Sequence, residues 1–488
     1  MRAPTLRASS SALAIAVMVL TGACGIELSA VVVPPAPGDA GDAGDPIDAS
    51  RPDVTSPGDA GKDAEPLPFP TIVQVAAALD RACVVEARGS LKCWGRNDVG
   101  QLGLGDTASR GSKPNEMGKM LLPVDLGPSA QVTQVAMGDR HSCAVLGDRS
   151  LKCWGYNGTG ELGLGDLDTR GDNPKEMGTD LAAVRLPTGR TAKEVAVGYE
   201  HTCAILDDGT LRCWGFNSRG QLGAGDTRSR GGVAADLGDG LKVVDLGTGR
   251  TAKHVAAGGE HTCAILDNDD VKCWGSSSSG QLGYGDFTTR GDGAGEMGDA
   301  LRAVDLGPGR KAKAIGTGTQ HTCALLDDDT VKCWGNAYFG QCGTGDINNR
   351  GDTAGEMGAA LKAIDLGQGH KAKGIGVGIN HTCVVLDNDE LRCFGADFDG
   401  QLGPLPGGFT SWGWTVNQMG SNLASIDLGP GAKVRAVTAA DTQTCALIGN
   451  DVKCFGRNIY GTLGQGDTKD RGKLPADMGA ALNPIPLF

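Results

Sequence analysis

Fourteen of the sixteen cysteines in this 488-residue chain form seven evenly spaced pairs, and paired thiols can be oxidised to disulfides. Between Cys203 and Cys213, two short apolar runs flank Asp-Asp-Gly-Thr, which is the pattern of a β-hairpin. Facing α-carbons in such a hairpin lie about 4.5 Å apart, within disulfide range. We predict seven disulfides, with seven reduced buried pairs as the alternative. The pairs are Cys83–Cys93, Cys143–Cys153, Cys203–Cys213, Cys263–Cys273, Cys323–Cys333, Cys383–Cys393 and Cys445–Cys454.

Five histidines share one position, two residues before the first cysteine of a pair, and a ring of imidazoles suggests a metal site. They are His141, His201, His261, His321 and His381. However, two nitrogens bound to one zinc ion lie roughly 3.3 Å apart, whereas packed sheets lie about 10 Å apart. We therefore predict structural histidines bonded to backbone, and no metal.

The long loops repeat G-D-x-x-x-R-G-D-x-x-x-E-M-G, as in residues 285–298. Asp286, Asp292 and Glu296 could supply oxygen ligands to calcium. Arg290 lies among them, so an ion pair between this arginine and one carboxylate is the simpler prediction. The chain contains no G-x-S-x-G, H-E-x-x-H or phosphate-loop motif. We predict that it is not an enzyme and binds no cofactor.

These residues recur because the chain is built from a sixty-residue unit. The second cysteine of each pair stands at 93, 153, 213, 273, 333, 393 and 454, and such a period indicates a repeat architecture. Each copy contains four candidate strands, which in the third copy cover residues 193–197, 202–206, 211–214 and 241–246. Seven four-stranded antiparallel sheets around an axis make an all-β, seven-bladed β-propeller.

Two further features predict how the blades pack and how the ring closes. A large ring follows the second cysteine in every copy, as Trp in five copies and as Phe394 and Phe455 in the last two. We predict that it packs as a wedge between neighbouring sheets. The recurrent V-D-L-G strand is absent before Ile72, and its seventh instance is residues 485–488. We therefore expect this C-terminal strand to pair with the N-terminal blade and close the propeller.

The repeat resembles that of the regulator-of-chromosome-condensation family. The string G-x-x-H-T-C-A-[IL]-L-D…[LV]-[KR]-C-W-G-x-N-x-x-G-Q-L-G-x-G-D stands at residues 198–226, with close variants at 138–166 and 258–286. Cys342 replaces the leucine of G-Q-L-G and is predicted to be a buried free thiol. The resemblance covers nearly all of residues 70–488 and implies a seven-bladed propeller. It does not imply nucleotide exchange on a nuclear GTPase, because fold alone does not choose a function.

The residues before the repeats predict export. Residues 1–23 combine two arginines, a short apolar run and small residues, as in a signal peptide. Cys24 follows at once and has no partner among the pairs, so we expect lipidation there, with simple cleavage and secretion as the alternative. Residues 24–69 are rich in Pro, Gly, Asp and Ala and predict a disordered linker. We expect an exported lipoprotein of a bacterial cell envelope, anchored to the membrane only by its lipid.

Function is predicted from four residues in each copy that vary between C-W-G and G-Q-L-G. These short loops must lie on one face of the ring. They hold Tyr156, Phe216, Tyr338, Phe339, Phe398 and Tyr460, and aromatic rings on loops of a rigid scaffold are typical anchors of protein interfaces. The alternative is that these rings pack back onto the blade below. The long loop of the sixth copy adds Phe409, Trp412 and Trp414. Trp412 and Trp414 are predicted to form either a second contact patch or a hydrophobic plug.

The sequence thus predicts a monomeric, non-catalytic scaffold that binds a protein partner through one loop face. A carbohydrate- or cell-wall-binding module is the first alternative, and a propeller enzyme such as a lyase or hydrolase is the second. The formal net charge is −13, with no basic stripe, which argues against a nucleic-acid partner.

Overall fold

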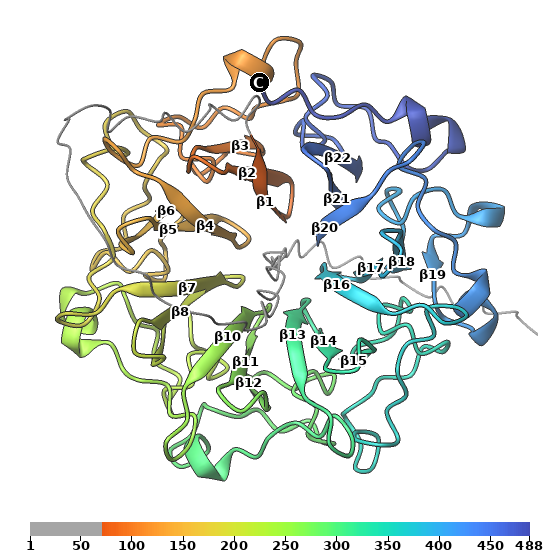
Figure 1. Ribbon diagram of the computed structural model, residues 1–488. Coiled ribbons are helices and arrows are strands. Elements are labelled where there is room, and N and C mark those ends of the chain that lie inside the picture. Colours follow the sequence, from red (N-terminus) through yellow and green to blue (C-terminus); the bar gives the residue numbers. More distant parts are fainter. Residues whose placement is uncertain (1–70) are drawn as a thin grey trace, which may run out of the picture.

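The computed structural model describes residues 71–488, which form seven small antiparallel sheets arranged around a central axis (Figure 1). Within each sheet, three consecutive strands run outward from the axis in sequence order. The first strands are β1 (Ile72–Ala78), β4 (Val132–Met137), β7 (Ala192–Val197), β10 (Ala252–Ala257), β13 (Ala312–Thr317), β16 (Ala372–Val377) and β20 (Val434–Ala439). The second are β2 (Arg81–Glu86), β5 (His141–Leu146), β8 (His201–Leu206), β11 (His261–Leu266), β14 (His321–Leu326), β17 (His381–Leu386) and β21 (Gln443–Ile448). The third are β3 (Leu91–Gly95), β6 (Leu151–Gly155), β9 (Leu211–Gly215), β12 (Val271–Gly275), β15 (Val331–Gly335), β18 (Leu391–Ala396) and β22 (Asp451–Gly456).

The long loops after the third strands carry short 3-10 helices. They are η1 (Gly118–Met120), η2 (Ala234–Asp236), η3 (Gly238–Gly240), η4 (Gly298–Ala300), η5 (Pro406–Gly408), η6 (Val416–Gln418), η7 (Gly420–Asn422), η8 (Pro475–Asp477) and η9 (Gly479–Ala481). No helix within residues 71–488 is long and apolar enough to cross a membrane. The predicted signal peptide, Cys24 and the linker lie outside the described residues.

Within residues 71–488 only the sixth sheet has four strands, and its fourth strand, β19 (Ser411–Trp412), which pairs with β18, is not the predicted segment around Ile426. In the other blades the long loop touches the third strand at separate points instead of forming a ladder. In the third blade, for example, Gly215 pairs with Arg230, and the Val244 amide donates to the Leu211 carbonyl at 2.9 Å. These isolated hydrogen bonds do not make a regular fourth strand, although the segment around Val244 is extended and apolar as predicted.

The predicted strand exchange at the C-terminus is wrong. The Ile485 amide donates to the Val452 carbonyl of β22 at 2.8 Å, so the final segment pairs within its own, last blade. Each blade is therefore one continuous stretch of sequence. The last and first repeats meet through the contact that joins other neighbours: the Trp94 indole donates to the Thr462 carbonyl at 2.8 Å, as Trp154 does to Gln101 at 3.1 Å.

The seven predicted disulfides and the aromatic wedges are confirmed. In every blade the second and third strands place the two cysteines directly opposite each other, as at Cys203 and Cys213, whose α-carbons are 4.1 Å apart. The rings that follow are fully buried, and Trp94 packs with Leu447 and Val452 of the last blade. Cys342 is the free thiol of the described chain and is buried, which raises its pKa.

Candidate protein-binding face

The short variable loops lie on one face of the ring, beside the turns between first and second strands. In the third blade the Phe216 amide donates to the Glu200 carbonyl of that turn at 2.8 Å. Asn217 fixes the loop, because its side-chain amide donates to the Asp226 carbonyl and its oxygen accepts from the Leu222 amide. The residue that follows this anchor, Ser218 here and Tyr338 or Phe398 in the fifth and sixth blades, is exposed. The repeat thus supplies a rigid loop with one exposed tip per blade.

Three of the predicted aromatic residues gather where the fifth and sixth blades meet. Phe339 packs edge-to-face on both neighbours, with ring centroids 5.0 Å from Tyr338 and 5.2 Å from Phe398. Tyr338 remains 64% exposed and Phe398 48% exposed, so the cluster presents apolar surface to solvent. We refer to Tyr338, Phe339 and Phe398 as the aromatic patch.

The long loop of the sixth blade adjoins the aromatic patch. An added Cβ at Gly340 would lie 2.7 Å from the Trp412 carbonyl oxygen and 2.9 Å from the Trp414 amide nitrogen, so the two backbones touch. Trp412 is only 9% exposed and donates to the Gln418 carbonyl, with Phe409 against its ring. Trp414 is 37% exposed, and Trp412 therefore has the position of a plug while Trp414 extends the apolar surface.

The remaining predicted aromatic residues do not join this group. The Arg140 guanidinium lies over the ring of Tyr156, 4.5 Å from the ring centroid. The Arg96 guanidinium lies over the ring of Tyr460 in the same way, at 5.4 Å. Phe216 is half-buried in its own loop. The sequence-based reasoning missed Val416, which is 73% exposed beside Gly345 in the same region. The sequence does mark this segment, because the long loop of the sixth copy is the one that lacks the acidic pattern of the other copies.

A cluster of charged side chains near the first blade was also missed. Burial raises the pKa of Asp139 and of Asp441 to about 7, and it raises the pKa of Asp80. Arginines 81, 96 and 457 lie near these carboxyls and oppose the shifts. Comparing the turn residues between copies would have shown that aspartate stands there only in the first, second and last repeats.

In the acidic long loop at residues 285–298, Asp286 and Glu296 bind groups of the same loop. Arg290 binds both oxygens of Asp286 at 2.8–2.9 Å, which confirms the predicted ion pair and lowers the pKa of Asp286 to about 2. Glu296 accepts from the amides of Gly291 and Gly293. Within residues 71–488 no group of three or more His, Cys, Asp and Glu side chains is arranged to hold a metal ion.

The five buried histidines join neighbouring blades through side chains, not through backbone as predicted. His201 Nε2 lies 2.9 Å from the Thr262 hydroxyl of the next blade, and that hydroxyl donates to the Gln221 carbonyl at 2.8 Å. Because the hydroxyl has only one proton, Nε2 must be the donor in this hydrogen bond. Burial lowers the pKa of each of the five to about 3.

These histidines predict a steep loss of stability below about pH 4. Between about pH 4 and 6.5 the unfolded chain binds up to five more protons on them. Four buried carboxyls with a pKa of about 7 are protonated only in the folded state there and nearly cancel this effect; they are Asp139, Glu161, Asp397 and Asp441. Below about pH 4 the carboxyls are protonated in both states. The free energy of unfolding should then fall by roughly 7 kcal/mol per pH unit until about pH 3.

Urea denaturation across pH 3–7 measures this profile. His261→Gln is the matched variant, since Gln443 occupies the same position in the last blade. It should make the steep acid limb shallower by about one fifth. An acid limb with the wild-type slope in this variant would contradict the assignment.

Comparisons with known proteins agree with the fold. Residues 132–161, 192–221, 252–281, 312–341 and 372–401 match a model of the regulator of chromosome condensation (RCC1) repeat, and residues 88–145 match a second model of that description. Each of the five matches begins at the first residue of the first strand of a blade.

Two curated proteins and one solved structure illustrate the similarity. The ultraviolet-B receptor UVR8 of Arabidopsis thaliana is 29% identical over 351 residues, which cover 70% of this chain and 71% of UVR8. The human E3 ubiquitin-protein ligase HERC2 is 31% identical over 264 residues, 53% of this chain but only 5% of HERC2. The crystal structure of Prp20p from Saccharomyces cerevisiae superposes with a TM-score of 0.60 at 19% identity, covering 81% of this chain and 85% of Prp20p. The chain therefore belongs to the family of proteins built from RCC1 repeats.

Proposed function

We propose that this propeller is a non-catalytic scaffold that binds a protein partner through the aromatic patch and the adjoining Trp414. The observation that carries the proposal is the exposure of Tyr338 and Phe398 on loops that hydrogen bonds hold in place. Large rings presented rigidly lose little conformational entropy on binding and dominate interface energies. Prp20p, which has the same fold, is described by its binding to Gsp1p and histones, so protein binding has a precedent on this architecture.

We also propose that the protein works outside the cytoplasm. Seven disulfides indicate an oxidising compartment. Lipidation of Cys24 would anchor the protein, as a monomer, to a membrane. The mass of the N-terminal peptide of the mature protein tests whether Cys24 carries a lipid. The carbohydrate-binding alternative requires Trp412 and Trp414 to form a stacking platform together. The burial of Trp412 does not favour that arrangement.

Affinity capture from an envelope extract tests the binding face with two triple variants. One changes Tyr338, Phe339 and Phe398 to alanine, and the matched control changes Tyr156, Phe216 and Tyr460, which lie in equivalent loops of other blades. We expect the first variant to lose the partner captured by the wild type, with affinity reduced about 100-fold or more. The control should retain the partner. Equal capture by both variants would refute the proposed face.

A further inference from the structure

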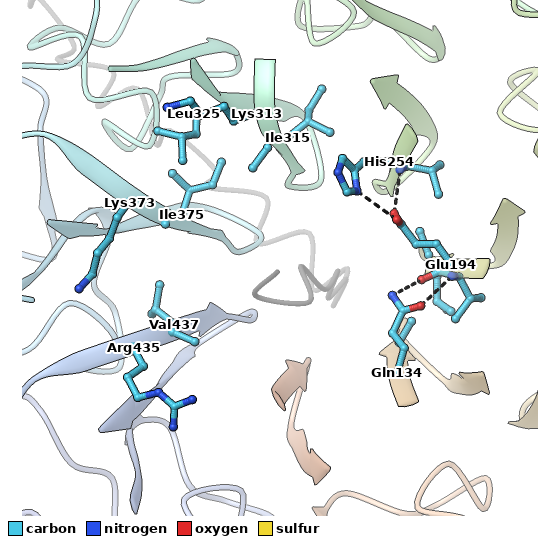
Figure 2. Close-up of a pocket in the computed structure, with 18 of the residues that line it drawn as sticks. Gln134, Glu194, His254, Lys313, Ile315, Leu325, Lys373, Ile375, Arg435 and Val437 are labelled. Carbon is cyan, nitrogen blue, oxygen red and sulfur yellow. Dashed lines mark hydrogen bonds and ion pairs between the residues drawn. The ribbon is translucent and has the colours of Figure 1, made fainter. Parts of the chain in front are cut away.

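A cavity of about 380 Å³ lies in the central channel, and none of the short-loop residues lines it (Figure 2). The first strands of the blades form its wall. Its apolar lining includes Val195, Val255, Ile315, Ile375 and Val437. Its volume lies within the range of small-molecule sites, which are mostly apolar with a few placed polar groups.

Two glutamine side chains of the protein show which polar group the backbone of these first strands binds. Each first strand has no partner strand on its channel side, so alternate backbone groups lack a ladder partner. Gln74 fills this need for the second blade: its amide donates to the Val135 carbonyl at 2.8 Å, and its oxygen accepts from the Val135 amide at 2.9 Å. Gln134 does the same at Val195, with both distances 3.0 Å. A carboxamide thus fits the strand edge in a bidentate manner.

This capping ends halfway around the ring (Figure 2). Glu194 accepts from the Val255 amide and from His254 Nδ1, at 3.0 and 3.1 Å. His254 occupies the position of Gln74 and Gln134 in the fourth blade, and Ala314, Gly374 and Ala436 occupy it in the fifth, sixth and seventh blades. None of these last three can reach the neighbouring strand.

The strand edges of the later blades have the same register as the capped ones. Ile375 faces Val384 and Val437 faces Ala446, just as Val135 faces Ala144. The amide and carbonyl of Ile375 and Val437 therefore point to the channel side, where no side chain of the described residues binds them. Both residues line the cavity. Space and unused hydrogen-bonding groups thus coincide on one half of the channel.

We propose that this cavity binds a small apolar molecule that carries a carboxamide. The amide of the ligand takes the place of the missing glutamine side chain at Ile375 or Val437. Its apolar body lies against the valine and isoleucine wall. This site is separate from the aromatic patch and does not depend on the protein-binding role.

The test titrates the full-length protein with hexanamide, 1-hexanol and hexanoate, and follows the methyl resonances of Ile315 and Ile375 by NMR. We expect saturable shifts with hexanamide and an affinity at least tenfold tighter than that of 1-hexanol. Equal affinity for the alcohol, tighter binding of hexanoate, or no saturable shift with hexanamide would overturn the proposal.

A double variant, Ala314→Gln with Gly374→Gln, should supply the missing caps and weaken hexanamide binding at least tenfold. A Cβ at Gly374 meets only Val385 at 3.8 Å, so the added side chain has room. Lys311→Gln, outside the cavity, is the matched control and should bind as the wild type does. Unchanged binding in the double variant would also overturn the proposal. If that variant does not fold, the comparison of the three probes on the wild type decides.

Discussion

Reduction of the seven disulfides in the unfolded chain is expected to prevent refolding at 37 °C. Each bridge closes a loop of nine or ten residues within one hairpin. In the loop-entropy model, one such bridge contributes about 2–3 kcal/mol. Folded domains are stable by only about 5–15 kcal/mol in total. Because every blade loses its bridge at once, no blade remains as a stable neighbour for the others.

Circular dichroism after dilution from urea, with and without dithiothreitol, measures this effect. Dithiothreitol added to the native protein is the control, because the paired cysteines are at most 3% exposed and should be reduced slowly. The double substitution Cys263→Ser with Cys273→Ser should cost about 2–3 kcal/mol by itself. A reduced chain that refolds with the oxidised denaturation midpoint would show that packing alone holds the blades.

Local patterns were sufficient to predict the hairpins, because the facing pair Cys203 and Cys213 depends only on strand alternation and turn length. The fourth strand was not predictable in the same way. Residues around Val244 are extended and apolar whether they form a ladder or a single hydrogen bond. The partner of Ile485 also depends on which blade lies beside it in space, and the periodicity is equally compatible with either choice.

The candidate site was predictable only as a set of positions. Tyr338 and Tyr156 occupy equivalent loops, yet one is exposed and the other lies under Arg140. Tyr338 follows the anchor position of its loop, whereas Tyr156 precedes the anchor Asn157, so their places in the loop account for this difference. The channel positions are also visible in the sequence as Gln, Gln, Glu, His, Ala, Gly and Ala. Their meaning appears only when Gln74 is seen to bind the strand edge of the next blade.

Arg81→Ala is expected to destabilise the junction between the first and second blades by about 3–5 kcal/mol. Arg81 stands where five other blades have histidine, and it is 1% exposed. Its guanidinium donates to the carbonyls of Gly138 and His141 at 2.9 and 2.8 Å, and also to that of Asp139. Alanine would leave the carbonyls of Gly138 and Asp139 without this donor, while the His141 carbonyl would keep only the Gly138 amide at 2.9 Å. Leaving buried acceptors unpaired is the costly way to break a buried polar contact.

Arg81→His separates the need for a link between blades from the need for this arginine. His141 Nε2 bonds the Thr202 hydroxyl of the next blade, and that hydroxyl donates to the Glu161 carbonyl. Ser142 occupies the equivalent position for residue 81, and its hydroxyl donates to the Gln101 carbonyl at 3.1 Å. A histidine at position 81 would therefore have the Ser142 hydroxyl as its partner. We expect this variant to recover at least half of the loss, measured as urea midpoints of the three proteins. If it is no more stable than the alanine variant, the reach of the guanidinium to three carbonyls is essential there. Recovery would instead mean that one neutral hydrogen bond per boundary is enough to hold adjacent blades together, because contacts in a repeat protein are confined to neighbours.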